Sequence, residues 1–157
     1  MPSEEEQDVT QTDQELDRIE RSIDIDAPAE RVWALIQRPG WWINEDEVDP
    51  DPELREEDGM TVLVHPTYAE FRLRTLEREE PRYVAFHWVD NVAPEAGTTV
   101  EFWIEDRLGG VTLRVVESGF GGLRKDRAAI DNQIRENTRG WEVELAAAKR
   151  FVLGETR

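Results

Sequence analysis

The sequence predicts an α+β domain in which helices cover one face of an antiparallel β-sheet. Three observations lead to this prediction. Apolar residues alternate with polar ones along six short segments, which is the period of strands with one buried face. Short connections such as Leu108-Gly109-Gly110 suit antiparallel hairpins. From about Lys125 to Val152, apolar residues recur at three- and four-residue steps instead, as in one long amphipathic helix.

The first strand and the first helix are predicted at the start of the domain. In residues 19–26, isoleucines alternate with polar residues, which predicts a half-buried strand. Asp26-Ala27-Pro28 then predicts a helix start, with Asp26 or Ala27 at the cap and Pro28 in the first turn. We expect this short helix to end before Pro39-Gly40. Its apolar face would consist of Val32, Trp33, Leu35 and Ile36.

The middle of the chain predicts a loop followed by strands. Residues 44–58 are acidic and contain prolines, so we expect a loop with short helical pieces at most. Five strand candidates follow, at residues 60–64, 68–76, 83–89, 98–105 and 111–117. An apolar face alternating with a charged face is typical of an antiparallel sheet covered on one side. The long final helix would close on Gly154.

Length and composition favour one domain. The 157 residues, 38% of them hydrophobic, are enough for a sizeable core, and we assign residues 18–154 to a single domain. Residues 1–17 are acidic and nearly free of apolar side chains, so a disordered tail is expected there. No apolar run approaches the roughly 18 residues of a membrane span, and no secretory pattern opens the chain. We therefore expect a cytoplasmic protein that does not bind membranes.

Charge and residue usage exclude several classes of function. The net charge of −17 argues against nucleic acid, because phosphate contacts depend on Lys and Arg. Residues 1–20 carry eight acids against one arginine, and residues 45–58 carry nine against one. Either cluster could bind a partner, although a solvated tail and a solvated loop are the simpler interpretation. Cysteine is absent and the two histidines, His65 and His87, lack triad-like spacing, so we predict no metal, no cofactor and no catalytic residue.

Four motifs resemble a known superfamily. The segment from Ile23 to Trp33 is similar to the first strand and helix of SRPBCC (START-like, helix-grip) proteins, and more narrowly of bacterial homologues of the activator of heat-shock-protein-90 ATPase. Three further motifs follow in the family's order, namely Glu80-Pro81-Arg82 before Phe86-His87-Trp88, Glu117-Ser118-Gly119-Phe120, and Asn137-Thr138-Arg139-Gly140-Trp141. The resemblance covers roughly residues 18–154. It implies a curved antiparallel sheet wrapped around a long C-terminal helix, with a cavity between them.

Two polar residues are predicted to face that cavity. Glu117 is in phase with Leu113 and Val115 on its strand, and Asn137 lies in the inner stripe of the final helix. Buried polar groups need partners, so the two residues would satisfy each other or form the polar end of an apolar pocket. Alternatively, Glu117 would accept from loop amides near Ser118 and Asn137 would cap backbone groups. The predicted ligand-binding residues are Trp42, Phe71, Phe86, Trp88, Phe102, Glu117, Ile134, Asn137 and Trp141, and the aromatic ones among them could equally be core.

Two further features bear on the cavity. Gly140 inside a helix costs about 1 kcal/mol relative to alanine, which close approach of the sheet or space for a ligand would offset. Close approach is the simpler explanation. Trp41 and Trp42 follow Pro39-Gly40 in a loop, and we expect them at the cavity mouth, one as a plug and the other exposed.

Three functions are compatible with these features. The preferred one is non-catalytic binding of a small hydrophobic or aromatic molecule in the cavity. The resemblance implies an alternative, a protein-interaction domain that stimulates the ATPase of a heat-shock-protein-90 type chaperone, with residues 45–58 as the contact surface. A polyketide cyclase or aromatase ranks last, because Glu117 lacks a second convergent acid or base. The expected partners are a small hydrophobic ligand or a chaperone, for a chain that is a monomer or a homodimer.

Overall fold

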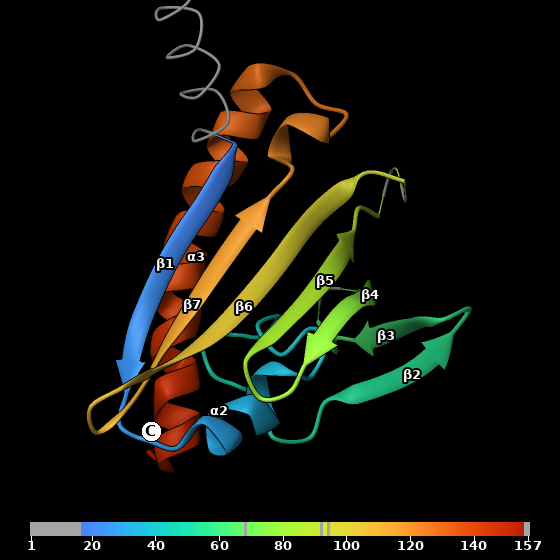
Figure 1. Cartoon of the computed structure of the whole chain (residues 1–157). Helices are drawn as coiled ribbons and strands as arrows, with labels where there is room; N and C mark the ends of the chain where they lie inside the picture. Colours follow the sequence, from blue (N-terminus) through green and yellow to red (C-terminus); the bar gives the residue numbers. More distant parts are fainter. Residues whose placement is uncertain (1–16, 68, 92, 94, 156–157) are drawn as a thin grey trace, which may run out of the picture.

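One curved sheet and one long helix make up most of the molecule. The computed structural model describes residues 17–67, 69–91, 93 and 95–155. Figure 1 shows α3 (Arg127–Leu153) lying along one face of the sheet, with α2 (Ala29–Ile36) at the end of the sheet near the C-terminus. The strands are β1 (Arg18–Ile25), β2 (Glu53–Glu57), β3 (Met60–Val64), β4 (Glu70–Glu79), β5 (Tyr83–Val89), β6 (Gly97–Arg107) and β7 (Gly110–Ser118). The α+β prediction is confirmed.

Strands β2 to β7 form an antiparallel meander, and β1 is the edge strand beside β7. The strand order is β1-β7-β6-β5-β4-β3-β2, and every neighbouring pair is antiparallel. Strand β1 pairs with β7, so the N-terminal strand lies beside the last one. Within the β6–β7 pair, Phe102 lies opposite Val115 and Val100 lies opposite Glu117. All four side chains are buried, so the alternation that directs the apolar residues of β7 inward also directs Glu117 inward.

The start of α2 differs from the prediction by one or two residues. The helix begins at Ala29, and Pro28 itself is the N-cap residue. Neither Asp26 nor Ala27 caps it, because Ala27 N–H donates to the Ile25 carbonyl in a tight turn and the Asp26 carboxylate accepts from Arg107 on β6. The predicted apolar face is confirmed, since its four residues are all buried.

Part of the predicted loop is a strand. Residues 53–57 form the edge strand β2, where we expected no regular structure. None of its side chains is buried, so the alternation that identifies the other strands is missing. The strand is held by its ladder with β3 and by Arg55, which binds Glu57 at 3.2 Å and Glu70 at 2.9 Å. An edge strand with a charged surface is also protected from pairing with another chain.

The other strand boundaries follow the prediction closely. Strands β3 and β5 have the predicted bounds, while β6 and β7 are longer than predicted by one or two residues at each end. Strand β4 continues past residue 76 through a bulge between Thr75 and Glu77, which leaves Leu76 exposed on the surface. Two predictions, the disordered tail over residues 1–16 and the strand position of Tyr68, lie outside the described residues.

Helix α3 begins and ends at residues that cap it. The Asp126 carboxylate accepts from the Ala129 N–H at 2.8 Å, so the helix starts two residues after the predicted Lys125. Gly154 closes it in the left-handed conformation, with φ of 76°, which glycine adopts without strain. Among the described residues, no helix is both long enough and apolar enough to cross a membrane.

Aromatic side chains fill the space between the sheet and the C-terminal half of α3. The Trp42 ring lies 5.6 Å from Phe86, 5.5 Å from Phe102 and 5.6 Å from Trp141, centroid to centroid. Trp41 is 3% exposed and Trp42 is 5% exposed. The expectation that these two tryptophans lie at a cavity mouth was therefore wrong. They are core residues, because burying two large rings against other aromatics is more favourable than leaving either in water.

Candidate functional site

Glu117 is a buried carboxylate with three hydrogen-bond donors. Thr98 Oγ1 donates to its Oε2 at 2.6 Å, while Asn137 Nδ2 at 3.1 Å and Trp141 Nε1 at 2.9 Å both donate to Oε1. The residue is 1% exposed. The predicted pairing of Glu117 with Asn137 is present, and it joins strand β7 to helix α3 across the core. The two contacts that the sequence did not indicate come from Thr98 and Trp141.

Burial and hydrogen bonding act on Glu117 in opposite directions. Removal from water raises the pKa of the carboxyl group, and the hydrogen bonds from Thr98, Trp141 and Asn137 oppose this rise. An ionised carboxylate can accept roughly four hydrogen bonds, two on each oxygen. Within the described part of the chain, Oε1 receives two and Oε2 receives one. One acceptor position on Oε2 is thus left for another donor.

An open pocket of about 610 Å³ lies beside Glu117. Its walls come from strands β4–β7, from the loops at residues 90–91 and 123–125, and from the first half of α3. In Figure 1 this is the end of the sheet that faces the orange loop before α3. Four of the predicted ligand-binding residues line it, namely Phe71, Trp88, Glu117 and Asn137.

The remaining five predicted residues lie elsewhere. Trp42, Phe86, Phe102 and Trp141 are in the buried aromatic core and are not among the residues that line the pocket. Ile134 is half-buried and packs against that core. Trp141 still reaches the site, because its indole N–H binds Glu117. The structure therefore divides the predicted set into an open part around Glu117 and a closed part around Trp42.

One face of α3 supplies pocket residues that the sequence reading missed. Five residues lie on this face, namely Asn137, which was predicted, and Ala129, Asn132, Gln133 and Glu136, which were not. They follow the i, i+3, i+4, i+7, i+8 spacing that places side chains on one helix face. The signal was available, because four of the five are polar at this spacing within an otherwise amphipathic helix. It was overlooked in favour of the apolar stripe through Ile130, Ile134 and Trp141.

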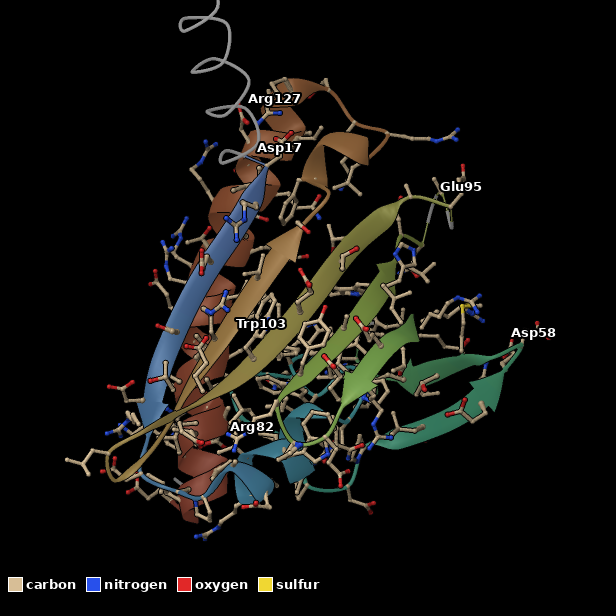
Figure 2. The ribbon with its side chains drawn as sticks, viewed as in Figure 1. Asp17, Asp58, Arg82, Glu95, Trp103 and Arg127 are labelled. Carbon is tan, nitrogen blue, oxygen red and sulfur yellow. The ribbon has the colours of Figure 1, made fainter. Side chains whose placement is uncertain are left out.

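Two loops form the rim of the pocket. Gly97 begins β6 with φ of 113°, and a Cβ there would lie 2.2 Å from the Trp88 carbonyl oxygen, so only glycine fits this approach of β6 to β5. Glu95, labelled in Figure 2, pairs with Arg124 at 2.7 Å and so links the β5–β6 connection to the loop before α3. Both side chains are largely exposed, so this ion pair contributes at most about 1 kcal/mol.

A second buried carboxylate lies on α3, three residues beyond Trp141 and outside the residues that line the pocket. Glu144 is 8% exposed and accepts from Asn44 Nδ2 at 2.7 Å. Burial, together with the nearby Asp46, raises its pKa to about 7, while Asn44 and Arg150 oppose the rise. Within the described residues, the Asn44 Oδ1 atom and the indole nitrogens of Trp41 and Trp42 are buried without a hydrogen-bond partner.

Gly140 does not approach the sheet closely. A Cβ at this position would meet no atom within 4 Å. The preferred explanation of this helical glycine, close packing, was therefore wrong, and open space surrounds it. Among the described residues, no cluster of three or more His, Cys, Asp or Glu side chains could hold a metal ion.

Comparison with known proteins identifies the family. Residues 26–149 match the family described as activator of Hsp90 ATPase homolog 1-like protein. No curated protein matches the chain by sequence.

Solved structures share the fold. The Aha1 dimer from Colwellia psychrerythraea is 14% identical with a TM-score of 0.66, over 89% of this chain and 98% of that one. A protein from Mesorhizobium loti is 16% identical with a TM-score of 0.64, over 89% and 98%. DynU16, from the dynemicin biosynthetic locus, is 17% identical with a TM-score of 0.65, over 87% of this chain and 47% of that one. These structures agree with the predicted helix-grip fold, and the family match shows that the chain belongs to the activator of Hsp90 ATPase homolog 1-like family.

Proposed function

We propose that this protein binds a small molecule with an apolar or aromatic body in the pocket beside Glu117, without transforming it. The observation that carries the proposal is a buried carboxylate, held by three donors, in the wall of an open pocket of about 610 Å³. Pockets of about 300–1,000 Å³ are typical of small-molecule sites. Burying a carboxylate costs free energy, and a site that uses its remaining acceptor position explains why the residue is placed there.

The two sides of the pocket differ in character. The sheet side carries Phe71 and Trp88, both only half-buried, so their rings offer apolar surface to a ligand. The helix side carries Asn132, Gln133 and Glu136, which offer hydrogen bonds. The ligand would therefore be amphipathic, with its carbon skeleton on the sheet and its polar groups toward α3. This is more polar than the apolar cavity that the sequence led us to expect.

The contacts of Glu117 favour binding over catalysis. Its three partners are a hydroxyl, an amide and an indole, none of which exchanges a proton near neutral pH. General acid–base chemistry at this position would use a proton-exchanging partner within hydrogen-bond reach of Glu117, and none of these three groups is one. We therefore propose that Glu117 orients a ligand.

A thermal-shift screen tests this proposal. The protein would be heated with a panel of aromatic polyketides, fatty acids and small aromatic molecules, and hits would be confirmed by native mass spectrometry. A ligand at 100 times its Kd adds about 2.7 kcal/mol to the free energy of unfolding, which raises the Tm by several degrees.

Two matched variants locate the binding site. Trp88→Leu should abolish the Tm rise. Trp103→Leu should keep it, because Trp103 lies on the face of the sheet opposite α3 and contacts Tyr83 and Arg114 (Figure 2). No rise with any compound, or an equal rise in the Trp88 variant, would refute the proposal.

The family match favours a second candidate function, stimulation of a chaperone ATPase. Strand β2 presents an acidic edge that could contact a basic surface of a partner. Adding the purified protein to an Hsp90-type chaperone from the same source, with and without charge reversal of Glu53 and Glu56, would test it. An unchanged rate of ATP hydrolysis would remove this candidate.

A further inference from the structure

We infer that the ligand of this pocket is an organic cation, an amine whose ammonium group lies among Glu117, Asp90 and Glu136 and whose carbon body lies on Trp88. The inference rests on the proposed function and narrows it to one class of ligand. It is based on the charges, the free acceptor atoms and the aromatic surface of the pocket.

The charges that line the pocket are mainly negative. Three carboxylates, Asp90, Glu117 and Glu136, face it from three different elements. Lys125 is the one cation among the described lining residues, and its Nζ donates to Gln133 Oε1 at 2.5 Å. Arg124 at the rim is paired with Glu95. The low-dielectric walls of a pocket focus the electric field of these negative charges. The pocket therefore attracts a cation and repels a carboxylate or a phosphate.

The carboxylate oxygens of the pocket also suit a ligand that donates hydrogen bonds. Asp90 Oδ2 accepts from the Ala93 N–H at 3.2 Å, and Glu136 Oε1 accepts from Asn132 Nδ2 at 3.1 Å. Within the described residues, the second oxygen of each carboxylate is left for a ligand, as is one position on Glu117 Oε2. An ammonium group carries up to three N–H donors and no acceptor, which matches a set of acceptors. Charge-assisted hydrogen bonds of this kind are about twice as strong as neutral ones.

The aromatic wall suits the rest of a cationic ligand. Trp is the best side chain for cation–π contact, which stabilises a cation that lies within about 6 Å of the ring. Trp88 and Phe71 both line the pocket and keep part of their surface exposed. An amine next to these rings would gain both this contact and the apolar burial of its carbon atoms.

Binding of a cation should depend on pH through Glu117. Its immediate partners Thr98, Asn137 and Trp141 are neutral, and the charged groups that share its pocket are Asp90, Glu136 and Lys125. Burial raises the pKa of Glu117 above its ordinary value, so a proton competes with a cation for this carboxylate at higher pH than it would for an exposed glutamate. An ammonium favours the ionised form, so it lowers this pKa and displaces the proton. The affinity for an amine should therefore rise with pH.

Isothermal titration calorimetry with three matched indoles tests the inference. Tryptamine, tryptophol and indole-3-propionate share a ring and differ in the charge of the side chain. We expect tryptamine to bind about tenfold more tightly than tryptophol, since a hydrogen bond to a charged group contributes about 1.5 kcal/mol. Indole-3-propionate should bind more weakly still. The preference should shrink as salt is raised, and the affinity for tryptamine should increase with pH.

Two glutamine variants identify the charge responsible. In Glu117→Gln the amide can still accept from Asn137 and Trp141 and can donate to Thr98, so the fold should survive. This variant should lose about tenfold in affinity for tryptamine, together with its pH dependence, and should lose less in affinity for tryptophol, which carries no charge. Glu144→Gln is the matched control, because Glu144 is a buried glutamate that does not line the pocket, and it should leave all three affinities unchanged.

The outcomes separate the inference from the proposed function. If tryptophol or indole-3-propionate binds as tightly as tryptamine, the cation inference is wrong and small-molecule binding stands. If none of the three binds, the cation inference is again wrong, and the thermal-shift panel decides the proposed function alone. If Glu117→Gln and the unaltered protein bind tryptamine equally, Glu117 is not the anionic anchor and the inference fails.

Discussion

The space between the sheet and α3 is closed at one end and open at the other. At the closed end, Trp42 contacts Phe86, Phe102 and Trp141, and the rings leave the interior filled. At the open end, the polar face of α3 and Trp88 line a pocket of about 610 Å³. Both ends contain a buried glutamate. Among the described residues, Glu144 at the closed end has a single side-chain donor, whereas Glu117 at the open end has three.

The two ends therefore have different roles, because one part of α3 stabilises the fold and another part borders the binding pocket. The face of α3 that borders the pocket is polar from Asn132 to Asn137, whereas the helix residues buried from Trp141 onward are apolar except Glu144. Three donors around Glu117 hold a carboxylate in a fixed position, which is what a binding group needs. Glu144 lacks such support, and its burial is a cost to the fold. Changes at the closed end should therefore alter the free energy of unfolding, and changes at the open end should alter ligand affinity.

Removing Trp42 should give the largest loss of stability. Trp42→Ala leaves a cavity among five aromatic rings and should lower the free energy of unfolding by about 3–5 kcal/mol, measured by urea denaturation. Trp103→Ala is the matched control on the outer face and should cost about 1 kcal/mol. A loss below about 1 kcal/mol for Trp42→Ala would show that the closed end is not tightly packed.

Glu144→Gln should stabilise the protein above neutral pH. A pKa raised from 4.5 to about 7 means that the folded state holds the proton more tightly than the unfolded state. The free energy of unfolding therefore falls as the pH rises from about 4.5 to 7 and then levels off, by up to about 3 kcal/mol. The glutamine removes this loss, and its amide can also donate to the unpaired Asn44 Oδ1. Urea denaturation at a series of pH values measures both effects.

The control for this prediction is Glu142→Gln, two residues away. Glu142 is exposed and pairs with Arg21 on β1, so its replacement should not change the dependence of stability on pH. A parallel pH dependence in Glu144→Gln and the unaltered protein would contradict the assignment.

Thr98→Val should disturb the open end moderately. The substitution keeps the shape of the side chain and removes the 2.6 Å hydrogen bond to Glu117 Oε2. We expect a loss of about 1.5–3 kcal/mol, larger at high pH where the carboxylate is ionised. Thr99→Val, the next residue on the outer face, should change the free energy of unfolding by less than about 0.5 kcal/mol. Equal effects of the two substitutions in chemical denaturation would mean that the hydroxyl contributes nothing at Glu117.

Gly140→Ala should give the smallest effect, a gain in stability. A Cβ at Gly140 meets no atom within 4 Å, and the helix gains from replacing glycine, so stability should rise by about 1 kcal/mol. Gly154→Ala should instead destabilise the helix end, because its φ of 76° strains any residue with a Cβ. Thermal unfolding compares the two, and a destabilised Gly140 variant would indicate a contact at this position.

The fold could be predicted well from the sequence, because the spacing of apolar residues shows which side chains of a strand or helix are buried. The strands with one buried face and the long helix were found at nearly their observed bounds, and the inward direction of Glu117 followed from the alternation in β7. The edge strand β2 was missed, since its ladder is made by backbone atoms and leaves no pattern in side chains that stay in water. The positions of Trp41 and Trp42 could not be derived, because a loop has no period.

The candidate site was only partly predictable for a related reason. Strand and helix periods identify the residues that point inward, but they do not show where the inward space is filled. Phe86 and Trp88 lie two residues apart on one strand, yet one is core and the other lines the pocket. Both rings lie 5.6 Å from Trp42, but Phe86 is fully buried, whereas Trp88 keeps part of its surface exposed to the pocket. Asn132, Gln133 and Glu136 were overlooked because a polar helix face is ordinarily assigned to solvent.

The indole N–H resonances of the six tryptophans test the central claim, that ligands enter the open end while the closed end stays packed. In ¹H–¹⁵N spectra recorded during a titration with tryptamine, the signals of Trp88 and Trp141 should shift in a saturable manner. Those of Trp41, at the closed end, and of Trp103, on the outer face, should stay in place. Shifts at Trp41 as large as those at Trp88 would mean that the ligand displaces the aromatic core, which would contradict the division of the molecule into two ends.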